Sequence, residues 1–91
     1  MNNEIILFLQ EWYQSKCDDV WEHEYGFDIS TIDNPGWMVS INGEKNRKLI
    51  NVDSEDGDNW IIINATENEF KGYGSPCNLL NILLYAQEWL K

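Results

Sequence analysis

The only histidine of the chain lies between two carboxylates, in Glu22-His23-Glu24, where base catalysis or metal binding is conceivable. Imidazole titrates near neutral pH, and neighbouring carboxylates can share its proton or a metal. In an extended segment, however, His23 would point away from both glutamates, because successive side chains alternate sides. No second histidine or suitably spaced cysteine completes a transition-metal shell. The sequence therefore favours a surface or capping histidine.

A second group of carboxylates lies in residues 53–59, DSEDGDN, and has the oxygen-rich composition of a calcium loop. Its spacing does not fit that motif. With Asp53 as first ligand, the sixth position is Asp58 instead of glycine, and the twelfth is Asn64 instead of glutamate. The segment is predicted to be either a solvated acidic loop or a loop that meets a basic partner.

The remaining residues supply no catalytic motif. One histidine cannot build a convincing nucleophilic triad, and no glycine-rich phosphate-binding motif is present. Cys17 and Cys77 lack zinc-ligand spacing and are expected to be reduced thiols. We therefore expect no metal, no cofactor and no enzymatic activity, although a small hydrolase that uses His23 is a third-ranked alternative.

The charge is strongly negative, with 16 acidic and 6 basic residues and a formal net charge of −10. Such a field repels nucleic acid and anionic membranes and attracts a basic partner. The alternative is general acidity that serves only solubility. Between Cys17 and Glu44 the chain has no Lys or Arg, and its acidic residues there are Asp18, Asp19, Glu22, Glu24, Asp28 and Asp33.

A chain of 91 residues is expected to form one domain, residues 1–91, since it cannot divide its apolar residues between two useful cores. Its N-terminus lacks the basic region and cleavage site of an export signal. No apolar run reaches the length of a membrane span. We therefore expect a cytoplasmic protein.

Helical periodicity marks both ends of the chain. Over residues 3–17, apolar side chains recur every three or four positions and predict a helix with Asn2 or Asn3 as N-cap. Ser75-Pro76 predicts the start of a second helix, which continues to the C-terminus. The apolar residues of that helix extend beyond one face, so a homodimer that covers them is possible.

Alternating patterns between these helices predict an antiparallel sheet. Residues 27–32 and 37–41 alternate with period two and are joined by the turn Asp33-Asn34-Pro35-Gly36, in which Gly36 would take a positive φ. Residues 49–52 are strand-like, 60–65 suit a central strand covered on both faces, and 68–73 form a fifth strand or an irregular edge. We predict a single α+β domain, with about four strands flanked by the N-terminal and C-terminal helices.

The tryptophans divide between core and surface. Trp12, Trp60 and Trp89 lie inside periodic elements and are predicted to be core residues. Trp37 is expected to close one end of the sheet, with an exposed patch as the alternative. Trp21 and Tyr25 could equally anchor a binding surface, as tryptophan and tyrosine often do.

The order WEH, YG and ISTIDNPGW over residues 21–37 resembles the immunity protein 53 family, which is encoded beside bacterial polymorphic toxins. The resemblance continues through Trp60, Phe70-Lys71-Gly72 and Ser75-Pro76 to the periodic leucines of the C-terminal helix, and so covers nearly the whole chain. The WE and DNPGW elements are its specific parts. The resemblance implies a protein that holds a toxin inactive.

The leading hypothesis is therefore a cytoplasmic immunity protein whose acidic surface binds a cognate toxin with a basic surface, for which a nuclease is a natural candidate. The alternative is a regulatory or adaptor module that binds a basic partner outside a toxin system. The predicted partner-binding residues are Asp18, Asp19, Trp21, Glu22, His23, Glu24, Tyr25, Asp53, Glu55, Asp56 and Asp58.

Overall fold

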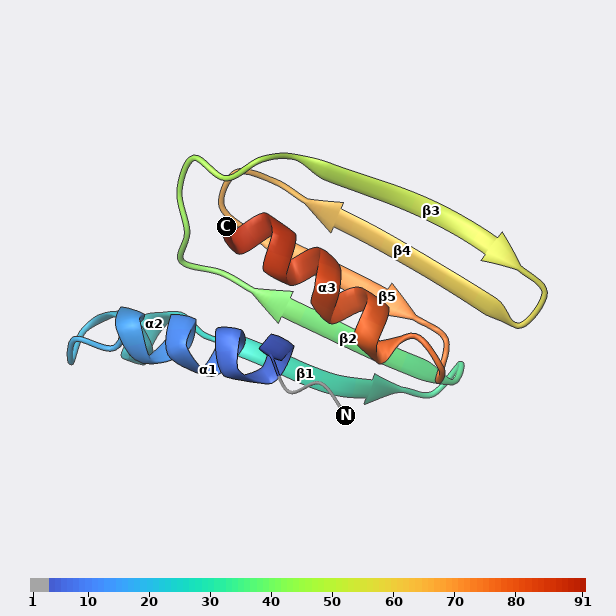
Figure 1. Ribbon diagram of the computed structural model, residues 1–91, viewed down its shortest axis with the longest axis horizontal. Helices are drawn as coiled ribbons and strands as arrows, with labels where there is room; N and C mark the ends of the chain where they lie inside the picture. The colour runs from blue at the N-terminus through green and yellow to red at the C-terminus, as the bar shows by residue number, and fades with distance from the viewer. Residues whose placement is uncertain (1–3) are drawn as a thin grey trace.

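The computed structural model describes residues 4–91 and has a helix near each end with a five-stranded sheet between them (Figure 1). This is the predicted α+β class, with five strands instead of about four. The elements are α1 (Glu4–Lys16), α2 (Trp21–Glu24), β1 (Phe27–Ile32), β2 (Gly36–Ile41), β3 (Ile50–Asp56), β4 (Asn59–Ala65), β5 (Phe70–Gly74) and α3 (Leu79–Leu90).

The sheet is antiparallel throughout, in the order β1-β2-β5-β4-β3. The β1–β2 hairpin is the predicted one, and β3 with β4 forms a second hairpin. The last strand in the sequence, β5, lies in the middle, between the two hairpins. The predicted fifth strand is thus real, but the irregular-edge alternative is wrong, because both long sides of β5 are hydrogen-bonded to neighbouring strands.

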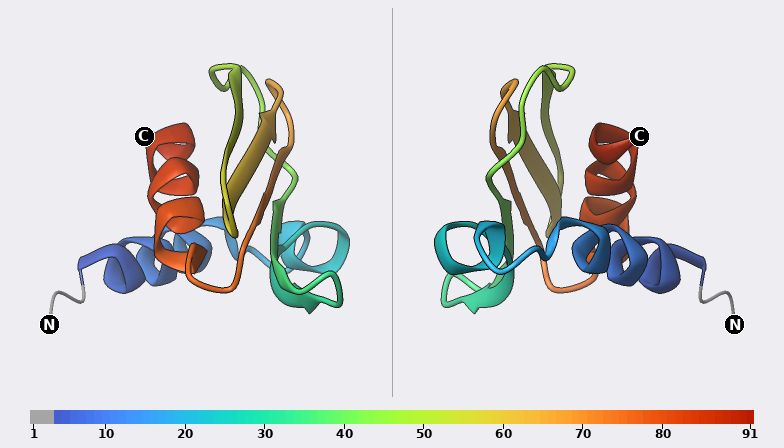
Figure 2. Two further views of the ribbon diagram at one scale, coloured as in Figure 1. Left: turned by 90° about the vertical axis from the view of Figure 1, so that its right-hand side faces the viewer. Right: turned by 90° about the vertical axis from the view of Figure 1, so that its left-hand side faces the viewer.

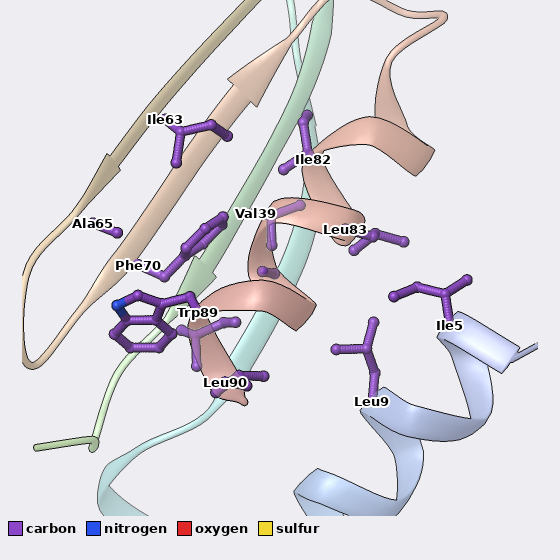
Figure 3. Packing of buried hydrophobic residues seen from close by; sticks show 12 residues of the cluster. Ile5, Leu9, Val39, Ile63, Ala65, Phe70, Ile82, Leu83, Trp89 and Leu90 are labelled. Atoms are coloured by element: carbon purple, nitrogen blue, oxygen red, sulfur yellow. The ribbon is translucent and has the colours of Figure 1, made fainter. Parts of the chain in front are cut away.

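One face of the sheet packs against α3 and forms the core (Figure 3). Val39, Ile63 and Phe70 from the strands are fully buried there with Ile82 and Trp89 of the helix. The helix lies close to β5 because that strand has glycines on this face. A Cβ added at Gly72 would come within 2.6 Å of the Ile82 side chain.

The N-terminal helix α1 lies on the same side of the sheet as α3 (Figures 1 and 2). Ile5 and Leu9 point toward α3 and are buried (Figure 3). Leu7, between them in the sequence, is half exposed. The proposed caps Asn2 and Asn3 lie outside the described residues. No helix in the described part of the chain is long and apolar enough to cross a membrane.

The opposite face of the sheet is uncovered, since no helix of residues 4–91 packs over it (Figure 2). The prediction that residues 60–65 are covered on both faces is therefore wrong. Trp60 and Ile62 lie on this open face and are only partly buried, so Trp60 is not a core residue. Of the three tryptophans predicted to be core residues, Trp89 is fully buried and Trp12 packs partly buried at the edge of the core.

The C-terminal helix begins at Leu79, three residues after the predicted start at Pro76. Asn78, and not Ser75, holds the N-cap position of this helix. The backbone N–H of Ser75 instead donates to the carbonyl of Trp60 at 3.0 Å. The buried Asn78 donates through Nδ2 to the same carbonyl at 2.8 Å. The segment before α3 is thus attached to β4, and the helix can begin only after it.

The predicted turn at the DNPG segment is confirmed, since the chain reverses there between β1 and β2 and Ile32 pairs with Gly36 across it. The reason for glycine at position 36 differs from the prediction. Its φ is not positive, unlike those of Gly43 and Gly57. A Cβ there would instead overlap the backbone carbonyl oxygen of Gly74.

Candidate protein-binding surfaces

The first predicted group of partner-binding residues lies at the junction of α1 and α2, where two of its carboxylates are used locally. Asp18 Oδ1 accepts hydrogen bonds from the backbone N–H groups of Val20 at 3.0 Å and Trp21 at 2.9 Å. The Glu22 carboxylate accepts from those of Asp18 at 2.9 Å and Asp19 at 2.8 Å. This reciprocal capping starts α2 where the sequence suggested an extended segment.

The same hydrogen bonds stabilise the ionised carboxylates. The backbone N–H groups of Trp21 and Val20 lower the pKa of Asp18 below its ordinary value. The backbone N–H of Glu22 itself, together with those of Asp18 and Asp19, lowers the pKa of Glu22. Both carboxylates are therefore protonated only at a lower pH in this folded junction than as free side chains.

Trp21 is the centre of an aromatic cluster that holds α2 against α1. Its ring packs edge-on against Trp12, with centroids 5.7 Å apart, and lies 6.0 Å from both Tyr13 and Tyr25. Its indole N–H donates to the carbonyl of Gly43 at 3.2 Å. Trp21 therefore has a structural role, while Tyr25 at the rim of the cluster is 42% exposed.

Trp37 lies on the helix-facing side of the sheet, partly buried against the core. Its indole N–H donates to the carbonyl of Pro76 at 2.9 Å and so joins the start of β2 to the segment before α3. This is the predicted position at the end of the sheet.

The second predicted group occupies a hairpin where the sequence indicated a loop. Residues 53–56 continue β3, and the chain turns only after them, through Gly57 with a φ of +63°. Asp53 and Glu55 pair with Ile62 and Trp60 and share their open face. Asp56 instead borders an open groove of about 590 Å³ between α3 and the hairpin.

The two groups lie at opposite ends of the long axis of the molecule (Figure 1). The domain extends 43 Å along this axis, and the α1–α2 connection and the β3–β4 turn mark its ends. The structure therefore does not join the predicted partner-binding residues into one surface. Within residues 4–91, no three His, Cys, Asp or Glu side chains gather in a way that could hold a metal ion.

Sequence reasoning missed a buried carboxylate. Glu44 pairs with Lys16 at the end of α1, with Oε2 2.7 Å from Nζ, and it accepts a hydrogen bond from Arg47 Nε at 2.8 Å. Arg47 in turn donates to the carbonyl of Leu90 at 2.7 Å, at the end of α3. Residues 42–47 consist only of polar residues and glycine, and the only local signal was the i, i+3 spacing of Glu44 and Arg47.

Sequence reasoning also missed a row of side chains on the open face. Tyr73 of β5 is paired with Met38 of β2 on one side and Ile62 of β4 on the other. All three are partly buried. The alternation within each strand contains this information, but the row emerges only when β5 is placed between the hairpins.

Together these features define a small α+β domain with one sheet face covered by helices and the other uncovered. The chain belongs to the immunity protein 53 family, whose family model matches residues 6–91. Its class is thus that of immunity proteins of toxin systems. No curated protein and no solved structure matches the chain significantly.

Proposed function

We propose that this protein binds a cognate toxin in the cytoplasm and neutralises it without catalysis. Membership of the immunity protein 53 family over residues 6–91 is the observation that carries the proposal. The formal charge of −10 supports it, because such a field favours a partner with a basic surface.

Neutralisation is then steric and electrostatic. Acidic side chains raise the rate of association with a basic toxin, whereas desolvated contacts at the centre of the interface set the lifetime of the complex. A nuclease fits this picture, since enzymes that bind phosphate backbones are basic around their sites. The protein would cover that site or another surface that the toxin needs.

Co-expression with the toxin domain encoded beside this gene tests the proposal. We expect the protein to rescue growth and to co-purify with the toxin in a complex that associates more slowly as salt increases. A toxin domain from an unrelated gene pair is the control and should not be neutralised. Failure of the neighbouring toxin both to bind and to be neutralised would contradict the proposed function.

A further inference from the structure

The open face of the sheet has an apolar centre. Met38, Tyr73 and Ile62 form its middle row across three adjacent strands. Trp60 follows on the same face, two residues before Ile62, and its ring extends toward Gly36, where an added Cβ would lie 3.2 Å from Trp60 Cζ2. These side chains shield one another only in part. Aromatic and methionine side chains of this kind are enriched at the centres of protein interfaces.

The outer strands surround this centre with negative charge. Asp28 on β1 and Asp53 and Glu55 on β3 are exposed, and they occupy open-face positions in the strand register. Among the described residues, neither Asp53 nor Glu55 has an ion-pair partner. Lys71 is the one basic residue at the open-face positions of the five strands. It forms an ion pair with Glu69, with Nζ 3.1 Å from Oε1.

We infer that this open face is the surface on which the toxin docks, an inference that rests on the proposed function. The arrangement of an apolar centre within a polar rim is that of a protein interface. The occupant is a toxin surface with apolar side chains over Tyr73 and Ile62 and basic side chains opposite Asp53 and Glu55. The charge complementarity of the rim selects a basic partner over a second copy of this acidic chain.

The α1–α2 junction is less suited to this role. Its carboxylates Asp18 and Glu22 already accept backbone hydrogen bonds, and Trp21 is held in the aromatic cluster. The open face, by contrast, has carboxylates that accept no backbone hydrogen bonds from the described residues and apolar side chains that are not packed in such a cluster. Asp53 and Glu55 of the hairpin thus belong to the docking surface, whereas the α2 residues lie outside it.

A double charge reversal tests the rim. Asp53→Lys with Glu55→Lys is expected to lower the association rate at least tenfold at low salt, with a smaller difference at high salt. The matched control is Glu11→Lys with Glu24→Lys, which changes the net charge equally on exposed positions of α1 and α2. Stopped-flow or surface-based kinetics with the neighbouring toxin would measure both variants.

Truncation tests the centre. Tyr73→Ala is expected to raise the dissociation rate at least tenfold, whereas Leu84→Ala, at an exposed apolar position of α3, should leave it unchanged. Circular dichroism and thermal unfolding verify that each variant folds. Ile62→Thr, which keeps a β-branched side chain, serves if Tyr73→Ala does not fold.

The outcomes separate this inference from the proposed function. If the wild-type protein does not bind the toxin, the proposed function fails. If the wild type binds and the open-face variants match their controls, the function stands and the docking surface is wrong. Weakening by the Glu11 and Glu24 reversals alone would also overturn it and would place the toxin at α2.

Discussion

Glu44 joins three distant parts of the chain through its carboxylate. Its partners are Lys16, in the last turn of α1, and Arg47, which also binds the carbonyl of Leu90. The carboxylate itself is almost fully buried. A buried charge requires such partners, since desolvation without them is strongly unfavourable.

Replacing Glu44 with alanine is therefore expected to lower the free energy of unfolding by about 2 kcal/mol, a value typical of hydrogen bonds to charged groups. The effect stays below that of a fully buried pair because Lys16 and Arg47 are 31% and 23% exposed and can hydrate. Urea denaturation measures it. Glu88→Ala breaks only the surface pair with Lys48 and should show no measurable change, so equal effects would contradict this role.

The requirement for glycine at position 36 also comes from a contact with a distant part of the chain. Any side chain at this position would meet the carbonyl oxygen of Gly74 on the neighbouring strand β5. The glycine of the DNPGW element thus permits close pairing of β2 and β5. Its role is structural, as is that of Trp37, which bonds Pro76.

We predict that Gly36→Ala lowers the free energy of unfolding by about 2 kcal/mol, as expected for a side chain forced into a packed site. Gly26→Ala is the matched control, because a Cβ there has no neighbour within 4 Å. Thermal and urea unfolding of both variants check this prediction. Similar stabilities for the two would show that the strands can separate to make room.

At the scale of elements, α2 exists because of its caps. A helix of four residues has little stability of its own. Here Asp18 accepts hydrogen bonds from the backbone N–H groups of Val20 and Trp21 at its start, and Glu22 accepts from those of Asp18 and Asp19 just before it. The sequence pattern suggested an extended segment because periodicity cannot be read over four residues. The contact between Trp21 and Trp12 then fixes this short helix on α1.

The capping makes α2 sensitive to acid. The pKa values of Asp18 and Glu22 are lower in the folded protein than their ordinary values of 3.8 and 4.5, so both groups stabilise α2 above those values. This stabilisation is lost as the pH falls through the lower, folded-state pKa values. NMR titration should show the amide signals of residues 18–22 shifting with midpoints below the ordinary values.

Glu22→Gln provides the control for this titration, because the neutral amide removes the Glu22 step and leaves that of Asp18. Midpoints at or above the ordinary values in the wild type would mean that the carboxylates do not stabilise the folded junction as ions.

At the scale of the whole molecule, net charge is the dominant property. A formal charge of −10 within 43 × 30 × 24 Å creates self-repulsion that opposes folding. The Glu44 carboxylate is buried, so its ion pairs are screened less than fully exposed charges. Salt should therefore remove more repulsion than attraction.

We expect the melting temperature at pH 7 to rise between about 10 mM and 150 mM sodium chloride, as the Debye length falls from roughly 30 Å to 8 Å. Scanning calorimetry or fluorescence would measure the shift. The double variant Glu11→Lys with Glu24→Lys reduces the net charge and should show a smaller rise. A melting temperature that falls with salt would mean that ion pairs outweigh the repulsion.

Self-association belongs to this scale as well. Leu80 and Leu84 on the outer side of α3 are 56% and 45% exposed. A homodimer formed through this apolar surface of α3 stays a prediction. Light scattering in solution would test it.

The sequence by itself determined the terminal helices, the hairpin of residues 27–41, the α+β class and the acidic composition. Period-3.6 and period-2 patterns and the DNPG turn are local signals, so they can be recognised without knowledge of the fold. Of the predicted partner-binding residues, the sequence located two acidic groups but could not show that they lie at opposite ends of the molecule.

Only the tertiary structure decided that β5 is the central strand, that α3 begins after Asn78, and that Glu44 is buried. It also decided which sheet face stays open, and so placed Tyr73 between Met38 and Ile62. The physical reason is that strand pairing, burial and ion pairing join residues far apart in the chain. Their energies depend on partners that no local pattern of residues specifies.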